Sequence, residues 1–447
     1  MAYNRKQRLN DNIKAIETAF ILDREQRTPT ARERLLLERY CGFGGLKCIL
    51  NPARELADAV HWAKSDLELF APTVELHRLI RENSKNESEY KQLMDSLKQS
   101  VLTAFYTPSA VTEALTDVLK EHQIIPEKVL EPSAGIGAFV DSVLDNNPKA
   151  DIMAFEKDLL TGKILRHLHP EQKVRIEGFE KIEKPFNDYF DLAISNIPFG
   201  DVAVFDPSYT AMKGMRALVT RRIHNYFFVK ALDTVRDGGL VAFITSQGVL
   251  NAKNNSAARF MMLYHADLVS AIRLPNNLFT ENANTEVGSD LIILQKNSQK
   301  ESLRGDDNLL DTVYNDENRI PTNNYFLEHP ERIIHTTAKL DTDPFGKPAM
   351  IYTHEDGVEG IAEDLRKMLH EDFKKNLNLN RYLGIEETMS EEVKEVEETE
   401  KIEETEKIKP SIEVKQNDTV VSCKSRKSLL MMQSYPKSPI ISSHQSK

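Results

Sequence analysis

The sequence is poor in cysteine: Cys41, Cys48 and Cys423 are its three, and none stands in a Cys-x-x-Cys pair. This spacing favours neither a structural zinc site nor a disulfide framework, and it is typical of a reducing compartment. The sequence also lacks a run of about 18 apolar residues, so it predicts no membrane-spanning helix. Its first twelve residues are polar and lack the apolar core of a signal peptide. We therefore expect a cytoplasmic protein without a bound metal.

The net charge of -11 argues at first against a nucleic-acid partner. Its distribution matters more than its sum. Residues 386–409 hold eleven Glu and four Lys, and the hexapeptide Glu-Glu-Thr-Glu-Lys-Ile occurs twice there, at 397–402 and 403–408. A segment of this composition has too little apolar surface to bury a core. We predict that residues 385–447 form a charged, disordered tail, which leaves the rest of the chain only mildly acidic.

Residues 1–98 are predicted to form a helical N-terminal region, because apolar residues recur three and four apart in 12–23 and 30–40. Between these helices and the next lies the glycine-rich segment Cys41-Gly-Phe-Gly-Gly-Leu46. A phosphate-binding P-loop would need Gly-Lys-Ser/Thr after a strand, and both are missing. We interpret the segment as a turn between helices.

Residues 99–300 show a different pattern, in which short β-rich runs alternate with helical ones. Strands are expected at 128–131, 151–155, 174–176, 190–196, 240–245, 268–274 and 290–295, with helices from about 138 and at 224–235 and 257–265. Alternation of this kind predicts a parallel sheet covered by helices. The last two strands have no long helix between them, which predicts an antiparallel edge. Residues 301–384 are expected to form a small subdomain, with an extended run at 324–327 and a helix at 358–377.

The first predicted strand runs into Val129-Leu-Glu-Pro-Ser-Ala-Gly-Ile-Gly-Ala-Phe139. Gly135 and Gly137 would let a ligand approach the backbone closely. A dinucleotide site would want a third glycine three residues on, where this chain has Val140. A cofactor without phosphates fits better, although a plain strand-to-helix turn would show the same spacing.

Acidic residues follow the next two strands. Glu156 lies about twenty residues after the glycine loop, where a carboxylate can accept hydrogen bonds from both ribose hydroxyls. A solvated loop acid is the alternative for Glu156. After the third strand, Phe179 would line an adenine pocket and Glu180 would accept from the adenine amine.

The fourth strand ends in Asn196-Ile-Pro-Phe199, and here the chain resembles amino-methyltransferases that carry an Asn-Pro-Pro-Tyr/Phe motif. The motif order is that of the DNA adenine-N6 subgroup. Phe105-Tyr-Thr-Pro108 matches the segment upstream of the cofactor loop in that subgroup, and the run from Asp237 to Gln247 matches its fifth strand. The resemblance covers about residues 100–297. More narrowly, the chain is similar to methylase modules at the front of large methylase–helicase proteins of bacterial mobile elements. These share the Gly-Phe-Gly-Gly-Leu segment and the isoleucine in place of the first proline of the motif.

The resemblance implies a Rossmann-like α/β fold, with a mostly parallel seven-stranded sheet, that binds S-adenosyl-L-methionine. The catalytic residues would be Asn196, Ile197, Pro198 and Phe199. The cofactor-binding residues would be Tyr106, Thr107, Glu131, Pro132, Ser133, Ala134, Gly135, Gly137, Phe139, Glu156, Lys157, Phe179 and Glu180.

The chemistry explains why the motif has these residues. The N6 amine of adenine is a poor nucleophile, because its lone pair is delocalised into the ring. The Asn196 side-chain oxygen and the Ile197 carbonyl would hold its two protons and make the nitrogen more tetrahedral. Pro198 would fix the turn, and Phe199 would stack on a base flipped out of the duplex. Since the methyl donor is a sulfonium, positioning would supply most of the acceleration.

Residues 210–222 contain four basic residues and no acidic one: Lys213, Arg216, Arg221 and Arg222. Beside the active site they would contact DNA phosphates, and a solvated loop is the plainer alternative. We interpret His224 as a packing residue at a helix start rather than a catalyst. Met212, Met215, Met261 and Met262 are interpreted as core or loop filler.

Three functions are compatible with these motifs. The first is methylation of the N6 amine of adenine in DNA, and the second is methylation of a protein glutamine or of an RNA amine, which uses a related Asn-Pro-Pro-Tyr turn. The third is a non-catalytic cofactor- or DNA-binding module of a helicase or conjugation system. The third follows from the lack of a target-recognition domain of normal size after residue 300. No helicase motif is present, so we expect no ATP hydrolysis by this chain.

Overall fold

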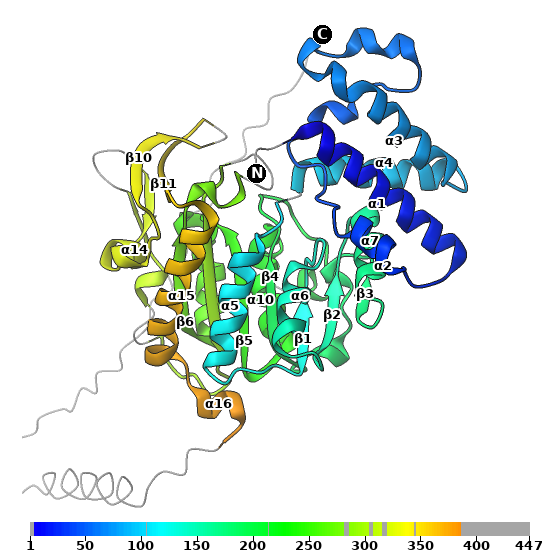
Figure 1. The fold of residues 1–447 in the computed structure, drawn as a ribbon. Coiled ribbons are helices and arrows are strands. Elements are labelled where there is room, and N and C mark those ends of the chain that lie inside the picture. The colour runs from blue at the N-terminus through cyan, green and yellow to red at the C-terminus, as the bar shows by residue number, and fades with distance from the viewer. Residues whose placement is uncertain are drawn as a thin grey trace, which may run out of the picture. The chain divides into compact units, whose positions relative to one another are not determined.

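The computed structural model describes residues 4–103, 105–212, 214–280, 286–303, 307–314, 320–343 and 346–385. Its centre is a sheet in the order β3-β2-β1-β4-β5-β7-β6 (Figure 1). The strands are β1 (Lys128–Glu131), β2 (Asp151–Phe155), β3 (Lys173–Arg175), β4 (Phe190–Asn196), β5 (Val235–Ser246), β6 (Ala266–Leu274) and β7 (Ser289–Lys296). The predicted α/β fold and its seven-stranded sheet are confirmed.

Five neighbouring strands of this sheet, β3 to β5, are parallel. The strand β7 runs antiparallel to both β5 and β6, so it reverses the chain direction near one edge. The predicted antiparallel pair is therefore present. Because the parallel strands end at the same edge, the loops after β1, β2 and β4 lie together there. Those three loops carry the sequence motifs.

Alternate residues of each strand face opposite sides of the sheet, as the period of two requires. On β1, Val129 packs with the helices of one face and Leu130 with those of the other. The first face is covered by α5 (Ser109–Glu121), α6 (Ala138–Asn146) and α15 (Gly357–Asn376) (Figure 1). The second is covered by α10 (Ile223–Thr234) and α12 (Ser256–His265). Burial on both faces explains the continuous apolar runs of these strands.

The N-terminal region is helical, as expected, with α1 (Arg5–Glu25), α2 (Ala31–Leu37), α3 (Phe70–Glu82) and α4 (Glu87–Thr103). A capping box formed by Thr30 and Glu33 begins α2. The glycine-rich segment is a turn after α2, in which Gly42 and Gly45 have φ angles of 65° and 76°. This confirms its interpretation as a turn.

These helices share a hydrophobic core with α7 (Leu159–Leu168), the helix that follows β2. Leu160, Ile164 and Leu168 of α7 are its contribution to that core. Asp23 of α1 adds ion pairs with Lys163 and with Arg166 at 3.1 Å, and its Oδ1 lies 2.8 Å from Nε2 of His167. The N-terminal region is thus packed directly on the sheet domain through α7.

The region after β7 contains β8 (Thr312–Tyr314) paired with β9 (Pro321–Asn323), and β10 (Thr337–Thr342) paired with β11 (Pro348–Thr353). The expected helix at 358–377 is present as α15, and its apolar side chains lie in the core of the sheet. The limits of the predicted subdomain stay a prediction. The expected extended run at 324–327 is wrong, because these residues form α14 (Asn324–Glu328). Asn323 caps α14 by accepting from the Tyr325 N–H at 3.0 Å.

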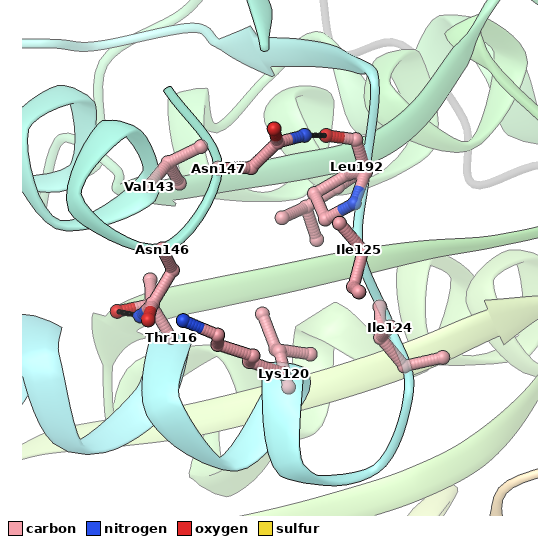
Figure 2. A pocket seen from close by; sticks show the side chains of 10 residues that line it. Thr116, Lys120, Ile124, Ile125, Val143, Asn146, Asn147 and Leu192 are labelled. Atoms are coloured by element: carbon pink, nitrogen blue, oxygen red, sulfur yellow. Dashed lines mark hydrogen bonds between the residues drawn. The ribbon is translucent and has the colours of Figure 1, made fainter. Parts of the chain in front are cut away.

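Two further features complete the fold. The last helix of the described residues is α16 (Leu379–Leu383), and the predicted tail at 385–447 lies almost wholly outside them. Within the described ranges, no helix is long and apolar enough to cross a membrane. A small apolar cleft of about 20 Å³ lies where α5 ends, beside Ile125, Val143 and Leu192 (Figure 2). It has room for about one water molecule, so it is too small for a cofactor.

Candidate active site

The loop after β1 turns sharply into α6 through its two glycines. Gly135 and Gly137 have φ angles of 56° and 93°, which side chains other than glycine rarely adopt. A Cβ on Gly135 would lie 2.8 Å from Cε1 of the Tyr106 ring. The two sequence segments predicted to bind the cofactor, Phe105–Pro108 and Glu131–Phe139, therefore meet at Gly135.

Other residues of this loop have structural contacts. The Ala134 N–H donates to the Phe155 carbonyl at 2.8 Å, and the Ser195 hydroxyl donates to the Ser133 carbonyl at 3.3 Å. These bonds join the loop to β2 and β4. Pro132 is buried, and Phe139 packs in the core between the sheet and α6. Phe139 therefore anchors the loop to the hydrophobic core.

Glu131 and Glu156 are acidic side chains at the ends of β1 and β2. Glu131 is only 2% exposed, and its Oε2 has no hydrogen-bond partner among the described residues. Burial raises the pKa of Glu131 well above its usual range, and the Glu156 carboxylate adds to this. A buried acceptor without a donor is costly, so Glu131 favours a ligand that brings a donor.

Glu156 already holds the loops together. Its Oε2 accepts from the Gly135 N–H at 2.8 Å, and its Oε1 accepts from the Asp158 N–H at 2.6 Å. Burial first, and then the neighbouring Asp158 carboxylate, raise the pKa of Glu156 to about 8. Each carboxylate oxygen can accept a second hydrogen bond, so the ribose role predicted for Glu156 fits these contacts. The alternative of a solvated loop acid fits less well, because Glu156 is only partly exposed and both carboxylate oxygens accept backbone hydrogen bonds.

The residues after β3 are placed differently from one another. Phe179 is 1% exposed and its ring packs against Phe155, Tyr226 and Phe227. It is therefore part of the core, where it would lie behind the residues that line an adenine pocket and would not contact the adenine. The Glu180 carboxylate folds over Gly178, in the space that a side chain at 178 would fill. Lys157 is 78% exposed and lies 3.7 Å from Glu180.

At the end of β4, the Asn196 amide has a defined orientation. Its Nδ2 donates to the Phe105 carbonyl at 2.8 Å, which leaves the Oδ1 as the free end of the amide. The Ile197 N–H donates to the Ile244 carbonyl of β5 at 3.0 Å. A proline at position 197 would lack this N–H. Isoleucine therefore replaces the ring constraint of the usual motif with a ladder hydrogen bond and a buried side chain.

The ring of Phe199 packs edge to face on Phe279, with their centroids 6.2 Å apart. Phe279 itself is fully buried. The sequence analysis missed Phe279, because it lies eighty residues further along the chain and in no motif. It also missed the Phe105 carbonyl, since a backbone atom leaves no mark in a motif.

Thr107 and Tyr106 line a cavity of about 330 Å³ between the N-terminal region and the first turns of α5 and α6. Ile136, Tyr40 and Cys41 line it too. Thr107 is 6% exposed, and its hydroxyl has no hydrogen-bond partner among the described residues. It is the second buried polar group of the predicted cofactor segments that is left without a partner.

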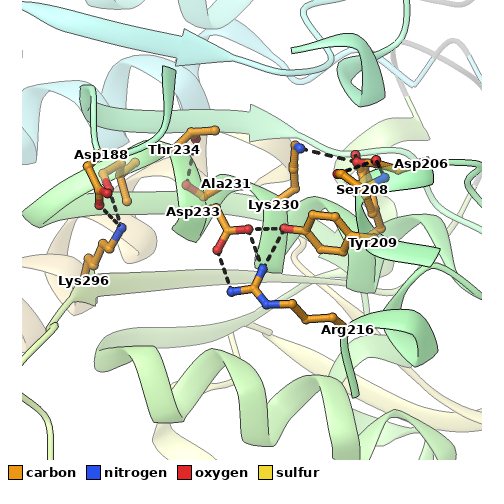
Figure 3. Close-up of polar contacts among 12 residues, drawn as sticks. Asp188, Asp206, Ser208, Tyr209, Arg216, Lys230, Ala231, Asp233, Thr234 and Lys296 are labelled. Atoms are coloured by element: carbon orange, nitrogen blue, oxygen red, sulfur yellow. Dashed lines mark hydrogen bonds and ion pairs between the residues drawn. The ribbon is translucent and has the colours of Figure 1, made fainter. Parts of the chain in front are cut away.

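The predicted DNA-binding residues differ in their surroundings. Arg216 makes two hydrogen bonds to Asp233, at 2.6 and 2.9 Å, beside the Tyr209 hydroxyl (Figure 3). Arg222 pairs with Asp201 at 2.7 Å. The Arg221 side chain is exposed and makes no ion pair or hydrogen bond with the described residues. Lys213 lies outside the described residues. Arg221 is thus the residue of this set best suited to meet a phosphate.

His224 is buried at the start of α10, and burial lowers its pKa to about 4. A neutral, buried imidazole agrees with its interpretation as a packing residue. Met261 and Met262 lie in the core, whereas Met212 and Met215 are exposed. Among the described residues, no group of three or more His, Cys, Asp or Glu is placed to hold a metal ion.

The site fits S-adenosylmethionine better than a dinucleotide. The buried Glu131 and Thr107 oxygens can accept hydrogen bonds from ribose, amine or ammonium groups. The side chains of Glu131, Glu156 and Glu180 offer no positive charge to a pyrophosphate. No third glycine follows Gly137 to support a pyrophosphate.

Comparison with known proteins agrees with this geometry. The model of the family N-6 DNA Methylase matches residues 88–391. "Defense against restriction protein B" of Escherichia phage P1 is 29% identical over 201 residues, which are 44% of this chain and 8% of that protein. The type II methyltransferase M.XamI of Xanthomonas campestris pv. amaranthicola is 25% identical over 173 residues, which are 36% of this chain and 33% of that protein.

Among the solved structures that match is the type I restriction-modification system methyltransferase subunit from Streptococcus thermophilus. It is 12% identical, covers 84% of this chain and 94% of its own length, and gives a TM-score of 0.37. The family match spans more than half of the chain and includes the segments Phe105–Pro108, Glu131–Phe139 and Asn196–Phe199. The chain therefore belongs to the N-6 DNA methylase family, and its cofactor is S-adenosyl-L-methionine.

Proposed function

We propose that this protein transfers a methyl group from S-adenosylmethionine to the N6 amine of adenine in DNA. The observation that carries the proposal is the orientation of Asn196. Its Nδ2 donates to the Phe105 carbonyl at 2.8 Å, so Oδ1 is the end of the amide that faces the group to be methylated. An amide that faces a ligand with its oxygen can only accept hydrogen bonds there. An amine with two protons is the matching partner.

Two acceptors are needed to bring the N6 lone pair out of conjugation. The Asn196 Oδ1 would accept one amine proton, and the Ile197 carbonyl would accept the other. Both are held by bonds to neighbouring segments, Asn196 to Phe105 and Ile197 to β5. The sulfonium of the cofactor supplies an electrophilic methyl group, so the protein's part is to align the amine with it.

Phe199 would stack on the target base. Its contact with the buried Phe279 supports the ring from one side, and stacking on an aromatic ring contributes about 1–3 kcal/mol per base. DNA as the acceptor is favoured by the family and by the exposed, unpaired Arg221 after the motif. The target adenine would be flipped out of the duplex, because its amine cannot be reached inside the base stack.

The test uses labelled S-adenosylmethionine, the full chain and duplex DNA from a strain without adenine methylation. We expect label in N6-methyladenine after digestion to nucleosides. Asn196→Ala should lower the rate at least about 100-fold, as the loss of one preorganised polar group does at other active sites, while the cofactor still binds. Asn297→Ala is the matched control, because the Asn297 amide donates to Asp267 at 2.7 Å after β7 and should leave the rate unchanged.

The alternatives are separated by the acceptor. Ribosomal RNA and a release factor are offered under the same conditions. Label in either of them, and none in DNA, would overturn the proposal in favour of an RNA or protein-glutamine acceptor. Cofactor binding without label in any acceptor would favour the non-catalytic module.

A further inference from the structure

Ser96 lies on α4 of the N-terminal region, yet its side chain forms part of the start of α7. The Ser96 hydroxyl donates to Asp158 Oδ2 at 2.7 Å and accepts from the Leu160 N–H at 3.0 Å. The other Asp158 oxygen, Oδ1, accepts from the Thr161 N–H at 2.7 Å. Two side chains therefore satisfy the first N–H groups of α7 together. One of them comes from 62 residues earlier in the sequence.

The same Asp158 is bonded to the predicted cofactor acid. Its backbone N–H donates to Glu156 Oε1 at 2.6 Å, and Glu156 Oε2 accepts from the Gly135 N–H at 2.8 Å. The Ser96 hydroxyl is thus joined to the glycine loop through Asp158 and Glu156. A shift of Asp158 would move one of the two bonds that fix the Glu156 carboxylate.

A second path joins the N-terminal region to the same place. The Thr161 hydroxyl lies 3.2 Å from the Tyr40 hydroxyl and 3.5 Å from that of Tyr106. Tyr106 in turn covers Gly135. Tyr40, Thr161 and the α7 residues around them are buried, so these contacts are shielded from water and energetically stronger than exposed ones.

Asp158 depends on its donors. Burial raises its pKa, while the Thr161 and Ser96 hydrogen bonds oppose that shift. Its negative charge also lies beside Glu156, whose pKa it raises. Removal of the Ser96 donor would therefore disturb two neighbouring carboxylates rather than one.

We propose that the N-terminal helical region is a working part of the cofactor site, and that Ser96 is the positioning residue that holds Asp158 and, through it, Glu156. The inference rests on the proposed function, because it takes Glu156 as a ligand of the cofactor. It gives the N-terminal region a role in cofactor affinity in addition to its contribution to the fold.

The chain offers a matched control. Ser270 on β6 donates to Asp372 on α15 at 2.7 Å, and both residues are buried. Both Ser96→Ala and Ser270→Ala remove a hydrogen bond from serine to aspartate, one beside the predicted site and the other between β6 and α15. Ser96→Ala also leaves the Leu160 N–H without its acceptor, so it should lower the unfolding temperature at least as much as Ser270→Ala. Only Ser96→Ala should weaken S-adenosylmethionine binding in calorimetry, by about tenfold, since hydrogen bonds to charged groups are of that order.

Kinetics separate positioning from general damage. Ser96→Ala should raise the KM for S-adenosylmethionine by about tenfold and leave kcat within about twofold, because Glu156 would bind the cofactor in ground and transition states alike. Tyr40→Phe removes only the hydroxyl beside Thr161 and should weaken cofactor binding in the same direction. It provides the test if Ser96→Ala fails to fold.

Three results would overturn the inference. The first is wild-type cofactor affinity in Ser96→Ala, or in Tyr40→Phe if that is the variant that folds. The second is an equal loss of affinity in Ser270→Ala, which would show that affinity merely follows stability. The third is a wild-type protein that binds no S-adenosylmethionine, which would defeat the cofactor site itself. Wild-type binding with loss in the variant and none in the control supports it.

Discussion

Gly135→Ala would test whether the glycine loop lies in the cofactor site, because it adds a single methyl group to that loop. The φ of Gly135 is 56°, and alanine in this left-handed region costs about 1–2 kcal/mol. The added Cβ would also lie 2.8 Å from the Tyr106 ring, and overpacking of this kind costs about 1–3 kcal/mol. Since Tyr106 can tilt, we expect a total loss of about 2–4 kcal/mol in the free energy of unfolding.

Gly384→Ala isolates the part due to backbone strain. Gly384 has a φ of 66° and no atom within 4 Å of its Cβ position. We therefore expect it to lose only the strain of about 1–2 kcal/mol. Urea unfolding of both variants gives the two values, and their difference measures the contact with Tyr106.

The same variants are compared in calorimetric titration with S-adenosylmethionine. Gly135→Ala should bind the cofactor at least about tenfold more weakly, since Tyr106 and the Glu156 contact both move. Gly384→Ala should bind it like the wild type. Gly135→Val, with a larger and branched side chain, should abolish binding. Unchanged affinity in either Gly135 variant would refute the assignment of this loop to the cofactor.

Two further predictions concern charge. Cofactor affinity should rise with pH toward about 8, where burial and Asp158 have moved the pKa of Glu156. Hydrogen bonds from ribose favour the ionised carboxylate, so binding releases a proton below that pH. Titrations between pH 6 and 9 check this, and a rise of the same size in Glu156→Gln would contradict it. Arg221→Ala should weaken DNA binding and reduce the slope of log affinity against log salt concentration by about one. Arg216→Ala should mainly lower the free energy of unfolding, by about 1–3 kcal/mol, because Asp233 loses its ion-pair partner. Filter binding at several salt concentrations and urea unfolding distinguish the two, and equal salt slopes in both variants would count against the proposal for Arg221.

The positions of the strands and the antiparallel edge could be predicted, because local patterns and the lengths of the connections indicate them. The strands β1, β2 and β4 begin and end at the predicted residues, since each is a short apolar run bounded by polar or glycine residues. The strand β3 is shifted by one residue, which is within the usual uncertainty of strand ends. The helix α14 was mistaken for an extended run because its aromatic residues favour strands. Its cap, Asn323, is held by the Leu250 and Leu309 carbonyls, and such distant contacts cannot be inferred from a local pattern.

The candidate site divides in the same way. A ligand at the end of a parallel strand needs a backbone that it can approach closely and side chains that accept its hydrogen bonds. Gly135, Glu131 and Glu156 could therefore be proposed from the sequence. Arg216 and Arg222 could not be separated from Arg221, because only the fold shows that Asp233 and Asp201 neutralise the first two. Phe179 was expected to face a ligand, whereas its ring is enclosed by three other aromatic rings.

Position 197 shows how a departure from a motif can preserve its chemistry. The usual proline restricts the backbone by its ring, and isoleucine has no such restriction. In this chain the Ile197 N–H bonds to β5 and its side chain is buried, so the turn is held by tertiary contacts instead. The carbonyl that would accept the amine proton is kept in both cases. The motif therefore constrains the position of two acceptors, Asn196 Oδ1 and the carbonyl after it, more than the identity of the residue that carries the second.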